Sequence, residues 1–176
     1  MACKEVYDMN DYSNFYRLKR IKSYNDPHFR QISCVLSKLR NEYPGFHRWF
    51  NTTVKVGLSN DSRQVWIAIS SHGEMAGILI LKKQPEEKKI CTLYVLEKFR
   101  NQGIGTLLMK TALKQVGTDK PLATVSSNHI NEYSRLLKKY QFLPKKIYKD
   151  YYRSGVSEIS FNGELLDTSH LLEKHG

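Results

Sequence analysis

The chain has 176 residues with 40% apolar and 26% charged side chains, a length and composition that favour one globular domain with a sizeable core. It contains no apolar run near the ~18 residues of a membrane span, and its start, MACKEVYDMN, has no apolar stretch. We therefore expect a soluble, cytoplasmic protein without a signal peptide or a membrane partner. Cys3, Cys34 and Cys91 are widely spaced and the histidines are scattered, which argues against a metal site and a disulfide framework. The net charge of +11 favours an acidic partner, with nucleic acid the first candidate.

The first sixty residues predict two helices. Asn25 or Asp26 can cap a helix that begins at Pro27, where the missing N–H costs nothing. Pro44-Gly45 should end this helix, and a second, shorter one follows. The apolar side chains at helical spacing are Phe29, Ile32, Leu36, Leu39 and Tyr43 in the first helix and Phe46, Trp49 and Phe50 in the second. Residues 16–22 stand out only for four basic side chains without an acidic one.

Three runs rich in apolar and β-branched residues follow, at 64–71, 75–83 and 89–96. A short turn, His72-Gly73-Glu74, separates the first two, and residues 84–87 form a second loop. This spacing predicts an antiparallel meander of three strands.

The second half of the chain predicts alternating helices and strands. A helix follows the glycine-bearing turn at 100–105 and ends at Gly117, and a buried strand at 122–126 should run parallel to the third strand because a helix connects them. Asn128 or Ser127 can cap the next helix, and residues 141–149 and 156–161 resemble a closing strand pair. The apolar faces of the two helices consist of Ile104, Leu107, Leu108, Ala112 and Val116, and of Ile130, Tyr133, Leu137 and Tyr140.

The turn RNQGIG is the feature of the sequence that indicates chemistry. Its two glycines allow a sharp bend and a close approach to a ligand, and the helix that follows presents unpaired N–H groups and the positive end of its dipole. Together they make an anion site suited to a pyrophosphate. A Walker A loop is excluded because no lysine follows Gly105, and a Rossmann turn is disfavoured because Leu108 occupies the third glycine position. The two glycines alone are equally compatible with a loop that binds nothing.

The stretch VLEKFRNQGIGTLLMKTAL resembles the acetyl-CoA-binding motif of the GNAT superfamily of N-acetyltransferases, whose core is Q/R-x-x-G-x-G/A. Arg100, Gly103 and Gly105 match its fixed positions. The resemblance extends from about Val65 to Phe161, whereas residues 1–60 match only as two early helices. It implies one N-acetyltransferase domain over residues 1–176, with a mixed α/β (α+β) fold. The implied sheet is mostly antiparallel, has a V-shaped splay between two parallel strands and is flanked by helices.

The resemblance also implies a site for acetyl-CoA as co-substrate. Backbone amides of the bend would hold the pyrophosphate, the third strand would hydrogen-bond the pantetheine arm, and the thioester would lie in the V. The implied cofactor-binding residues are Leu93, Tyr94, Val95, Arg100, Asn101, Gln102, Gly103, Ile104, Gly105 and Thr106, and no metal is expected.

Acetyl transfer to an amine benefits from a proton donor for the leaving thiolate and from a base for the amine. In the family the donor is often a tyrosine ahead of a Gly-Phe pair, but here the pair reads Gln141-Phe142 and the usual position holds Leu137. Tyr133 and Tyr140 flank that position, and either is a candidate acid, Tyr133 slightly preferred. Weaker candidates for a base or a cleft residue are Glu97, Glu74, Tyr94 and Cys91.

The acceptor is open between aminoacyl-tRNA and a protein or small-molecule amine, and its primary amine would attack the thioester directly. Residues 135–153 carry seven Lys/Arg against one Asp, with interleaved tyrosines that suit stacking and phosphate contact. The charge disfavours polyamines and aminoglycosides unless the fold hides an acidic cleft, and no acidic cluster is visible in the sequence. The alternative is a non-catalytic, basic nucleic-acid-binding module that retains or has lost CoA binding. The sequence leaves open the oligomeric state, a homodimer included, and whether the protein is a toxin, a resistance enzyme or a housekeeping enzyme.

Overall fold

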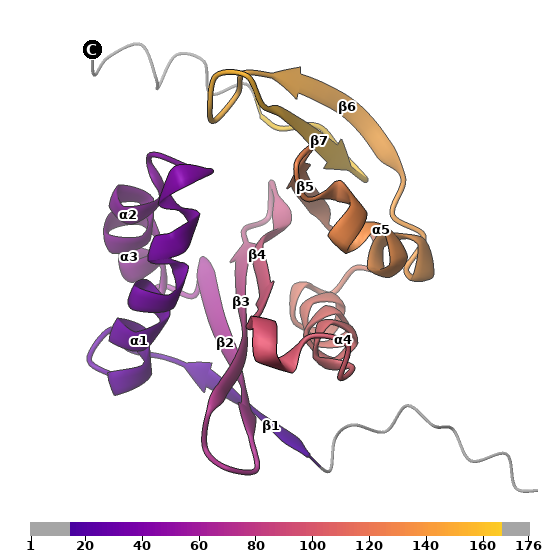
Figure 1. The fold of residues 1–176 in the computed structure, drawn as a ribbon. Coiled ribbons are helices and arrows are strands. Elements are labelled where there is room, and N and C mark those ends of the chain that lie inside the picture. The colour runs from indigo at the N-terminus through magenta and orange to yellow at the C-terminus, as the bar shows by residue number, and fades with distance from the viewer. Residues whose placement is uncertain (1–14, 167–176) are drawn as a thin grey trace, which may run out of the picture.

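The computed structural model describes residues 15–166 as a seven-stranded sheet with helices on both faces (Figure 1). The strand order is β1-β2-β3-β4-β5-β7-β6, and of these described strands only β4 and β5 pair in parallel. The predicted mixed, mostly antiparallel sheet is thereby confirmed. Cys3 lies outside the described residues. The strands are β1 (Tyr16–Ile21), β2 (Arg63–Ser70), β3 (Met75–Lys83), β4 (Lys88–Val95), β5 (Leu122–Ser126), β6 (Pro144–Lys149) and β7 (Ser157–Phe161).

The N-terminal helices α1 (Pro27–Leu36), α2 (Phe46–Trp49) and α3 (Lys55–Gly57) lie together on one side of the sheet (Figure 1). Asp26 caps α1 by accepting a hydrogen bond from the His28 backbone N–H, as the Asn-Asp-Pro pattern predicts. The α-helix ends at Leu36 and continues as a 3-10 turn over Ser37–Asn41, so the prediction of one helix as far as Tyr43 was wrong. A π-helical turn, Phe50–Val54, joins α2 to α3. Among the described residues, none of the helices has the length and apolarity to cross a membrane.

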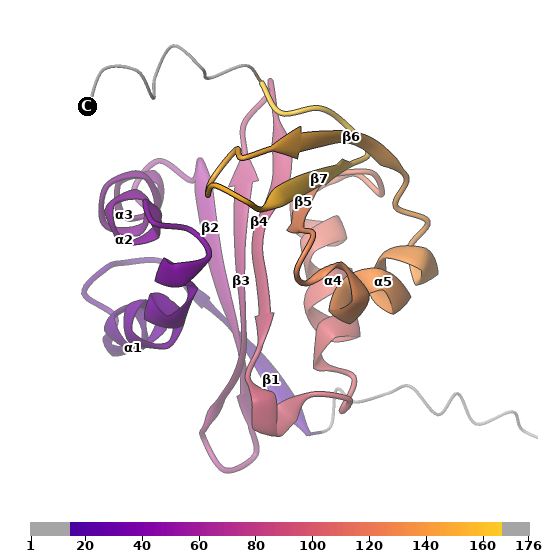
Figure 2. The same ribbon diagram turned by 45° about the horizontal axis from the view of Figure 1, so that its top comes forward.

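The opposite side of the sheet carries α4 (Ile104–Val116) and α5 (Ile130–Lys139), seen from a second direction in Figure 2. Gly117 ends α4 with φ +68° and donates to the Leu113 carbonyl, which confirms its predicted role. The residue that precedes α5 is His129, without a side-chain cap, so neither predicted cap, Asn128 or Ser127, holds.

Helices on both faces explain why the central strands are apolar throughout. Ile78 and Ile80 pack with the N-terminal helices, whereas Leu79 and Leu81, which alternate with them along β3, pack with α4. Gly77 allows α4 to approach closely, because a Cβ there would lie 2.9 Å from atoms of both Ile104 and Leu108. The first turn of α4 is therefore held against the sheet at a fixed place.

Strand β1 is the element that the sequence did not predict. It pairs antiparallel with β2, from Tyr16 opposite Ser70 to Ile21 opposite Val65. Its basic side chains are typical of an edge strand, which they protect against further pairing.

The sheet opens between β4 and β5. The two strands pair only at Lys89–Leu122 and Ile90–Ala123, and beyond these residues they separate. Thr92 opposes Ile80 and Ile90 opposes Leu81, so Cys91 is a surplus residue in β4 and forms a β-bulge where the pairing with β5 ends. A bulge bends its strand and increases its twist, which accounts for the V-shaped splay at this point.

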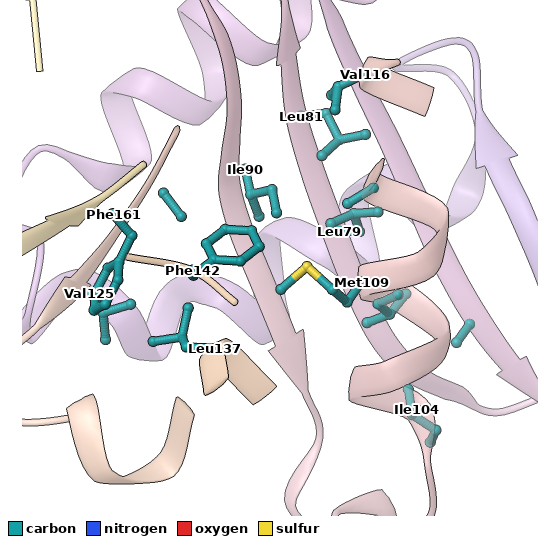
Figure 3. Packing of buried hydrophobic residues seen from close by; sticks show 14 of the residues in the cluster. Leu79, Leu81, Ile90, Ile104, Met109, Val116, Val125, Leu137, Phe142 and Phe161 are labelled. Carbon is teal, nitrogen blue, oxygen red and sulfur yellow. The ribbon is translucent and has the colours of Figure 1, made fainter. Parts of the chain in front are cut away.

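Apolar packing below the splay joins the two parts of the sheet. Figure 3 shows Phe142, at the end of α5, among Ile90 and Met109 from one part and Leu137 and Phe161 from the other. The gap between β4 and β5 is thus open at one end and closed by a core at the other.

Candidate active site

The bend before α4 presents backbone amides that are not used elsewhere. Asn101 and Gly103 both have positive φ, +61° and +80°, and α4 begins at Ile104 without a side-chain cap. Among residues 15–166, no protein acceptor takes a hydrogen bond from the amides of Gln102 to Thr106. A concave run of N–H groups at the positive end of a helix favours an anion, and a diphosphate is the group that such a bend suits best.

The side chains around the bend leave this run accessible. Gln102 accepts a hydrogen bond from the Tyr16 hydroxyl in β1 and donates one to the Lys98 carbonyl, at 3.0 Å, so its amide group is held by the protein. At Gly105 a Cβ would be in ordinary contact with Leu136 at 3.8 Å and Val95 at 4.0 Å, so the space beside the glycine, between α5 and β4, holds one methyl group without a clash. Within residues 15–166, no backbone carbonyl competes for the predicted anion site.

A cavity of about 710 Å³ passes through the splay between β4 and β5. Arg100, Tyr133 and Leu136 line it on the side of α4 and α5, whereas Tyr43, Trp49 and Tyr152 line it on the side of the N-terminal helices. Its volume is typical of a small-molecule site. One ligand can therefore enter from the side of the glycine bend while another approaches from the opposite side of the sheet.

Tyr133 spans the splay. Its hydroxyl donates a hydrogen bond of 2.8 Å to the carbonyl oxygen of Leu93 in β4. Burial raises the pKa of Tyr133 to about 12, with the neighbouring Glu132 adding to the effect and Arg100 opposing it. The hydroxyl is consequently protonated at neutral pH, and the raised pKa makes it a weaker acid than an exposed phenol.

Tyr140 lies elsewhere. Its hydroxyl is 3.5 Å from the Thr106 carbonyl in α4, burial raises its pKa, and it does not line the cavity. Leu137, at the usual tyrosine position, does line the cavity and supplies only apolar surface. The geometry brings Tyr133 to the splay and keeps Tyr140 away from it, and both catalytic roles stay predictions.

The predicted cofactor residues fall into two groups. Leu93, Tyr94 and Arg100 line the cavity, while Val95 ends β4 and residues 101–106 form the bend and the first turn of α4, which do not line it. Arg100 also lies 3.5 Å from Glu132 in α5, an ion pair near the surface. The side chain of Ile104 is buried in the core, so this residue can contribute to binding only through its backbone.

Of the four weaker candidates for a base or cleft residue, Tyr94 and Cys91 line the cavity and Glu74 and Glu97 do not. Glu74 is paired with Lys98 at 2.6 Å on the hairpin turn, and neither Glu74 nor Glu97 lines the cavity. Cys91 lines it, but burial raises the pKa of its thiol. Whether the protein binds a metal stays a prediction; within residues 15–166, no three His, Cys, Asp or Glu side chains gather as ligands.

Acidic residues that the sequence analysis missed meet beside the cavity. Glu158 in β7 is only 3% exposed, and its Oε1 accepts a hydrogen bond of 3.4 Å from the Tyr43 hydroxyl. Burial raises the pKa of Glu158 to about 7, against the opposing effects of Thr124 and Lys89. Glu42 lies 3.9 Å from His129, which in turn contacts Glu132 at 3.0 Å. These acids come from three distant segments, so no cluster is visible along the chain.

Comparisons with known proteins agree on one family. The profile of the Acetyltransferase (GNAT) family matches residues 21–134. No curated protein matches the sequence. Similar solved structures include an aminoglycoside 6'-N-acetyltransferase complexed with coenzyme A (TM-score 0.62, 15% identity, covering 86% of this chain and 99% of the other). Another is a GNAT family acetyltransferase from Elizabethkingia anophelis with acetyl-CoA bound (0.57, 18%, 84% and 97%). A third is a spermidine N-acetyltransferase variant from Vibrio cholerae (0.60, 10%, 85% and 95%). At these identities the similarity shows the fold.

Proposed function

This chain belongs to the GNAT family of acetyltransferases, and from that premise we propose that it binds acetyl-CoA at the bend before α4 and transfers the acetyl group to a primary amine. The observation that carries the proposal is the set of unused backbone amides at Gln102 to Thr106, beside a cavity that passes through the splayed sheet. The amides suit the diphosphate of the donor, and the cavity has room for its pantetheine arm and an acceptor.

The edge of β4 supports a role in binding the acyl donor. In a β-strand the N–H and C=O of one residue point to the same edge. Since the Leu93 carbonyl accepts a hydrogen bond from Tyr133 across the splay, the Leu93 N–H faces the splay as well. It is a candidate donor to the pantetheine or to the oxyanion that forms during attack on the thioester.

Transfer then requires two proton movements that this chain's residues can assist. The neutral amine attacks the thioester carbon directly, the C–S bond breaks, and the thiolate takes the hydroxyl proton of Tyr133. The proton that the new amide nitrogen loses restores the Tyr133 hydroxyl. Tyr133 is suited to this role by its position, because its hydroxyl carries a proton at neutral pH and reaches the β4 edge at Leu93 inside the splay.

We favour a small-molecule amine as the acceptor. The aromatic side chains Tyr43, Trp49 and Tyr152 line the acceptor side of the cavity, and Glu42 and Glu158 lie close behind them. Aromatic faces and carboxylates both attract an ammonium group. The names of two similar structures, an aminoglycoside and a spermidine N-acetyltransferase, refer to cationic amines of this kind.

The experiment that tests the proposal measures binding and turnover separately. Calorimetry should detect acetyl-CoA binding, and release of free CoA thiol should accelerate when a primary amine from a panel is added. A mass increase of ~42 Da on that amine, the mass of an acetyl group, identifies the product. Failure to bind acetyl-CoA would overturn the proposal, whereas binding without turnover on any amine, charged tRNA included, would favour the non-catalytic module.

A second candidate is the same reaction on an RNA-borne amine, favoured by the exposed edge strand β6. Its lysines Lys145 and Lys149 are exposed at the sheet edge. Lys138 and Lys139, at the end of α5, are exposed as well. The tyrosines of this region offer less ring surface for stacking on bases than we expected from the sequence. Tyr151 packs edge-on against both Tyr148 and Tyr152, with ring centroids 5.4 and 4.7 Å apart.

Binding of charged tRNA tests this candidate. If β6 contacts phosphates, replacing Lys145 and Lys149 with Glu should weaken the binding of charged tRNA. The slope of the logarithm of the binding constant against the logarithm of the salt concentration should fall by about one unit for each phosphate contact that is lost. The matched control reverses Lys110 and Lys114, which are exposed on α4 and change the net charge equally. Equal losses in the two double variants would show that only net charge matters and would remove β6 from consideration.

A further inference from the structure

Tyr43 and Glu158 form a polar pair behind the acceptor side of the cavity. Tyr43 lines the cavity, and its hydroxyl donates to Oε1 of Glu158 at 3.4 Å. Glu158 itself is almost fully buried in the middle of β7. Burying an ionised carboxylate in such a place costs free energy, so the group favours its neutral form. A buried acid with a shifted pKa beside a cavity is a candidate functional residue.

Strand register places this pair on the acceptor side of the sheet. Glu158 opposes Ser126 of β5, and Ser160 opposes Thr124, so these four polar side chains share one face. Val125, on the other face, packs with the core of α4 and α5. Thr124 and Ser126 line the cavity, so the polar face of β5 and β7 looks toward the side where Tyr43 and Tyr152 lie.

We propose that Tyr43 and Glu158 are the proton path of the acceptor subsite, which takes a primary amine that arrives as an alkylammonium ion. This inference rests on the proposed acetyl transfer. The ammonium gives a proton to the Tyr43 oxygen while the Tyr43 hydroxyl proton passes to Oε1 of Glu158. The amine is then neutral, Tyr43 is again a phenol and Glu158 is a neutral acid, which returns the proton to solvent after turnover. Tyr43 would touch the substrate, and Glu158 would act through it.

The groups around Glu158 fit a proton acceptor that works near neutral pH. Burial raises the pKa of Glu158 to about 7, and Glu42 adds to the rise. Lys89 and the Thr124 hydroxyl lower it, as does the hydrogen bond from Tyr43. Burial raises the pKa of Tyr43 and of Tyr152, so both stay phenols and Tyr43 can pass a proton without losing one permanently. A base poised near the working pH is the most effective kind.

Two amines of similar size separate this role from a structural one. Ethylamine is an ammonium ion at neutral pH, whereas trifluoroethylamine is largely unprotonated there. With ethylamine, kcat/KM of the wild type should rise with an inflection near pH 7. Glu158→Gln and Tyr43→Phe should each lower it about 100-fold at pH 7 and remove that inflection. With trifluoroethylamine both variants should stay within a few-fold of the wild type.

Matched controls keep the comparison specific. Glu164→Gln changes an exposed carboxylate that is paired with Lys146, and Tyr24→Phe changes an exposed tyrosine. Neither should alter the profile with either amine. Acetyl-CoA affinity, measured by calorimetry, should be unchanged in all four variants. Equal losses on the two amines, with the inflection retained, would overturn the proton path while leaving acetyl transfer intact.

A direct titration decides the matter without turnover. The Glu158 carboxyl carbon, followed by NMR in the full chain against the Glu158→Gln spectrum, should titrate near pH 7 and shift when Tyr43 is replaced by Phe. A carboxyl that titrates at its ordinary value near 4.5 would overturn the proposal. A wild type that binds no acetyl-CoA would instead overturn the proposed function.

Discussion

The Tyr133 hydroxyl and the Leu93 carbonyl are joined by a 2.8 Å hydrogen bond across the splayed strands, so the residue that we propose as the proton donor also marks the edge of β4 that we propose for the acyl donor. The donor must displace or rearrange this bond to use the β4 edge. The phenol would then be released next to the thioester.

Replacing Tyr133 with Phe should lower kcat about 100-fold, because the thiolate would leave without a proton donor. The affinity for acetyl-CoA should change little, since the edge of β4 is retained. Tyr140→Phe is the matched control, because its hydroxyl faces the Thr106 carbonyl outside the cavity. Steady-state kinetics and calorimetry on both variants check this, and a larger loss in Tyr140→Phe would reverse the assignment.

Replacing Gly105 with Val should weaken acetyl-CoA binding about 10- to 100-fold, because the added methyl groups crowd the limited space between Leu136 and Val95 and the bend that we propose for the diphosphate. Helix formation does not oppose this change, since Val is a better helix former than Gly. Gly163→Val is the control, because a Cβ there meets only Leu122 at 3.6 Å, far from the bend in sequence. Calorimetry measures both affinities, and equal values would remove the bend from the donor site.

Replacing Gly77 with Ala should destabilise the protein by about 1–3 kcal/mol, because the new Cβ would lie 2.9 Å from Ile104 and Leu108 and 3.2 Å from the Tyr94 carbonyl. The helix α4 would have to move away from β3, and the amides of its first turn would move with it. Denaturant unfolding and acetyl-CoA calorimetry should both report the change. Unaltered stability would mean that α4 does not depend on this close approach.

The buried Glu158 should make stability fall as pH rises. Its pKa is about 7 in the folded protein against 4.5 in the reference state, so the native state holds its proton more tightly. The stabilisation of the neutral acid is complete below pH 4.5 and is lost as pH rises through 7, a difference of about 3 kcal/mol. Unfolding of the wild type and of Glu158→Gln at pH 4.5, 6 and 8 isolates this group. If the free energies of unfolding of the two proteins changed equally with pH, the raised pKa of Glu158 would be contradicted.

Gln141 occupies a backbone conformation that favours glycine, with φ +54° just after α5. Its N–H donates to Lys138 and the N–H of Phe142 donates to Leu137, which closes the end of the helix. The family pattern has glycine at this position, and Gln141→Gly should stabilise the protein by about 1 kcal/mol. Thermal unfolding checks this, and destabilisation would show that the glutamine side chain has contacts that compensate for the strain.

The sequence predicted the elements that follow strong local patterns. The meander β2–β4, the bend at Gly103 and the end of α4 at Gly117 depend on alternation and on glycines, which are visible in a short window. Strand β1 was missed because its basic residues obscure the alternation of an edge strand that is recognisable only beside its partner β2.

The acceptor side could not be predicted from local pattern. Tyr43 was interpreted as the last core position of a long helix, but the helix ends at Leu36 and Tyr43 turns toward the cavity. Glu158 lies on the strand face that alternates with Ile159 and Phe161, the face that alternation assigns to solvent. The N-terminal segment, more than a hundred residues away, covers that face through Tyr43, together with Tyr152.

Cys91 matters as one extra residue in β4 relative to β3, and its thiol is not needed for this effect. Without this one residue, we expect β4 to stay in step with β3 and to continue alongside β5, which would close the passage. Deleting Cys91 should abolish the cavity more completely than any substitution, whereas Cys91→Ala or Cys91→Ser should leave the passage open.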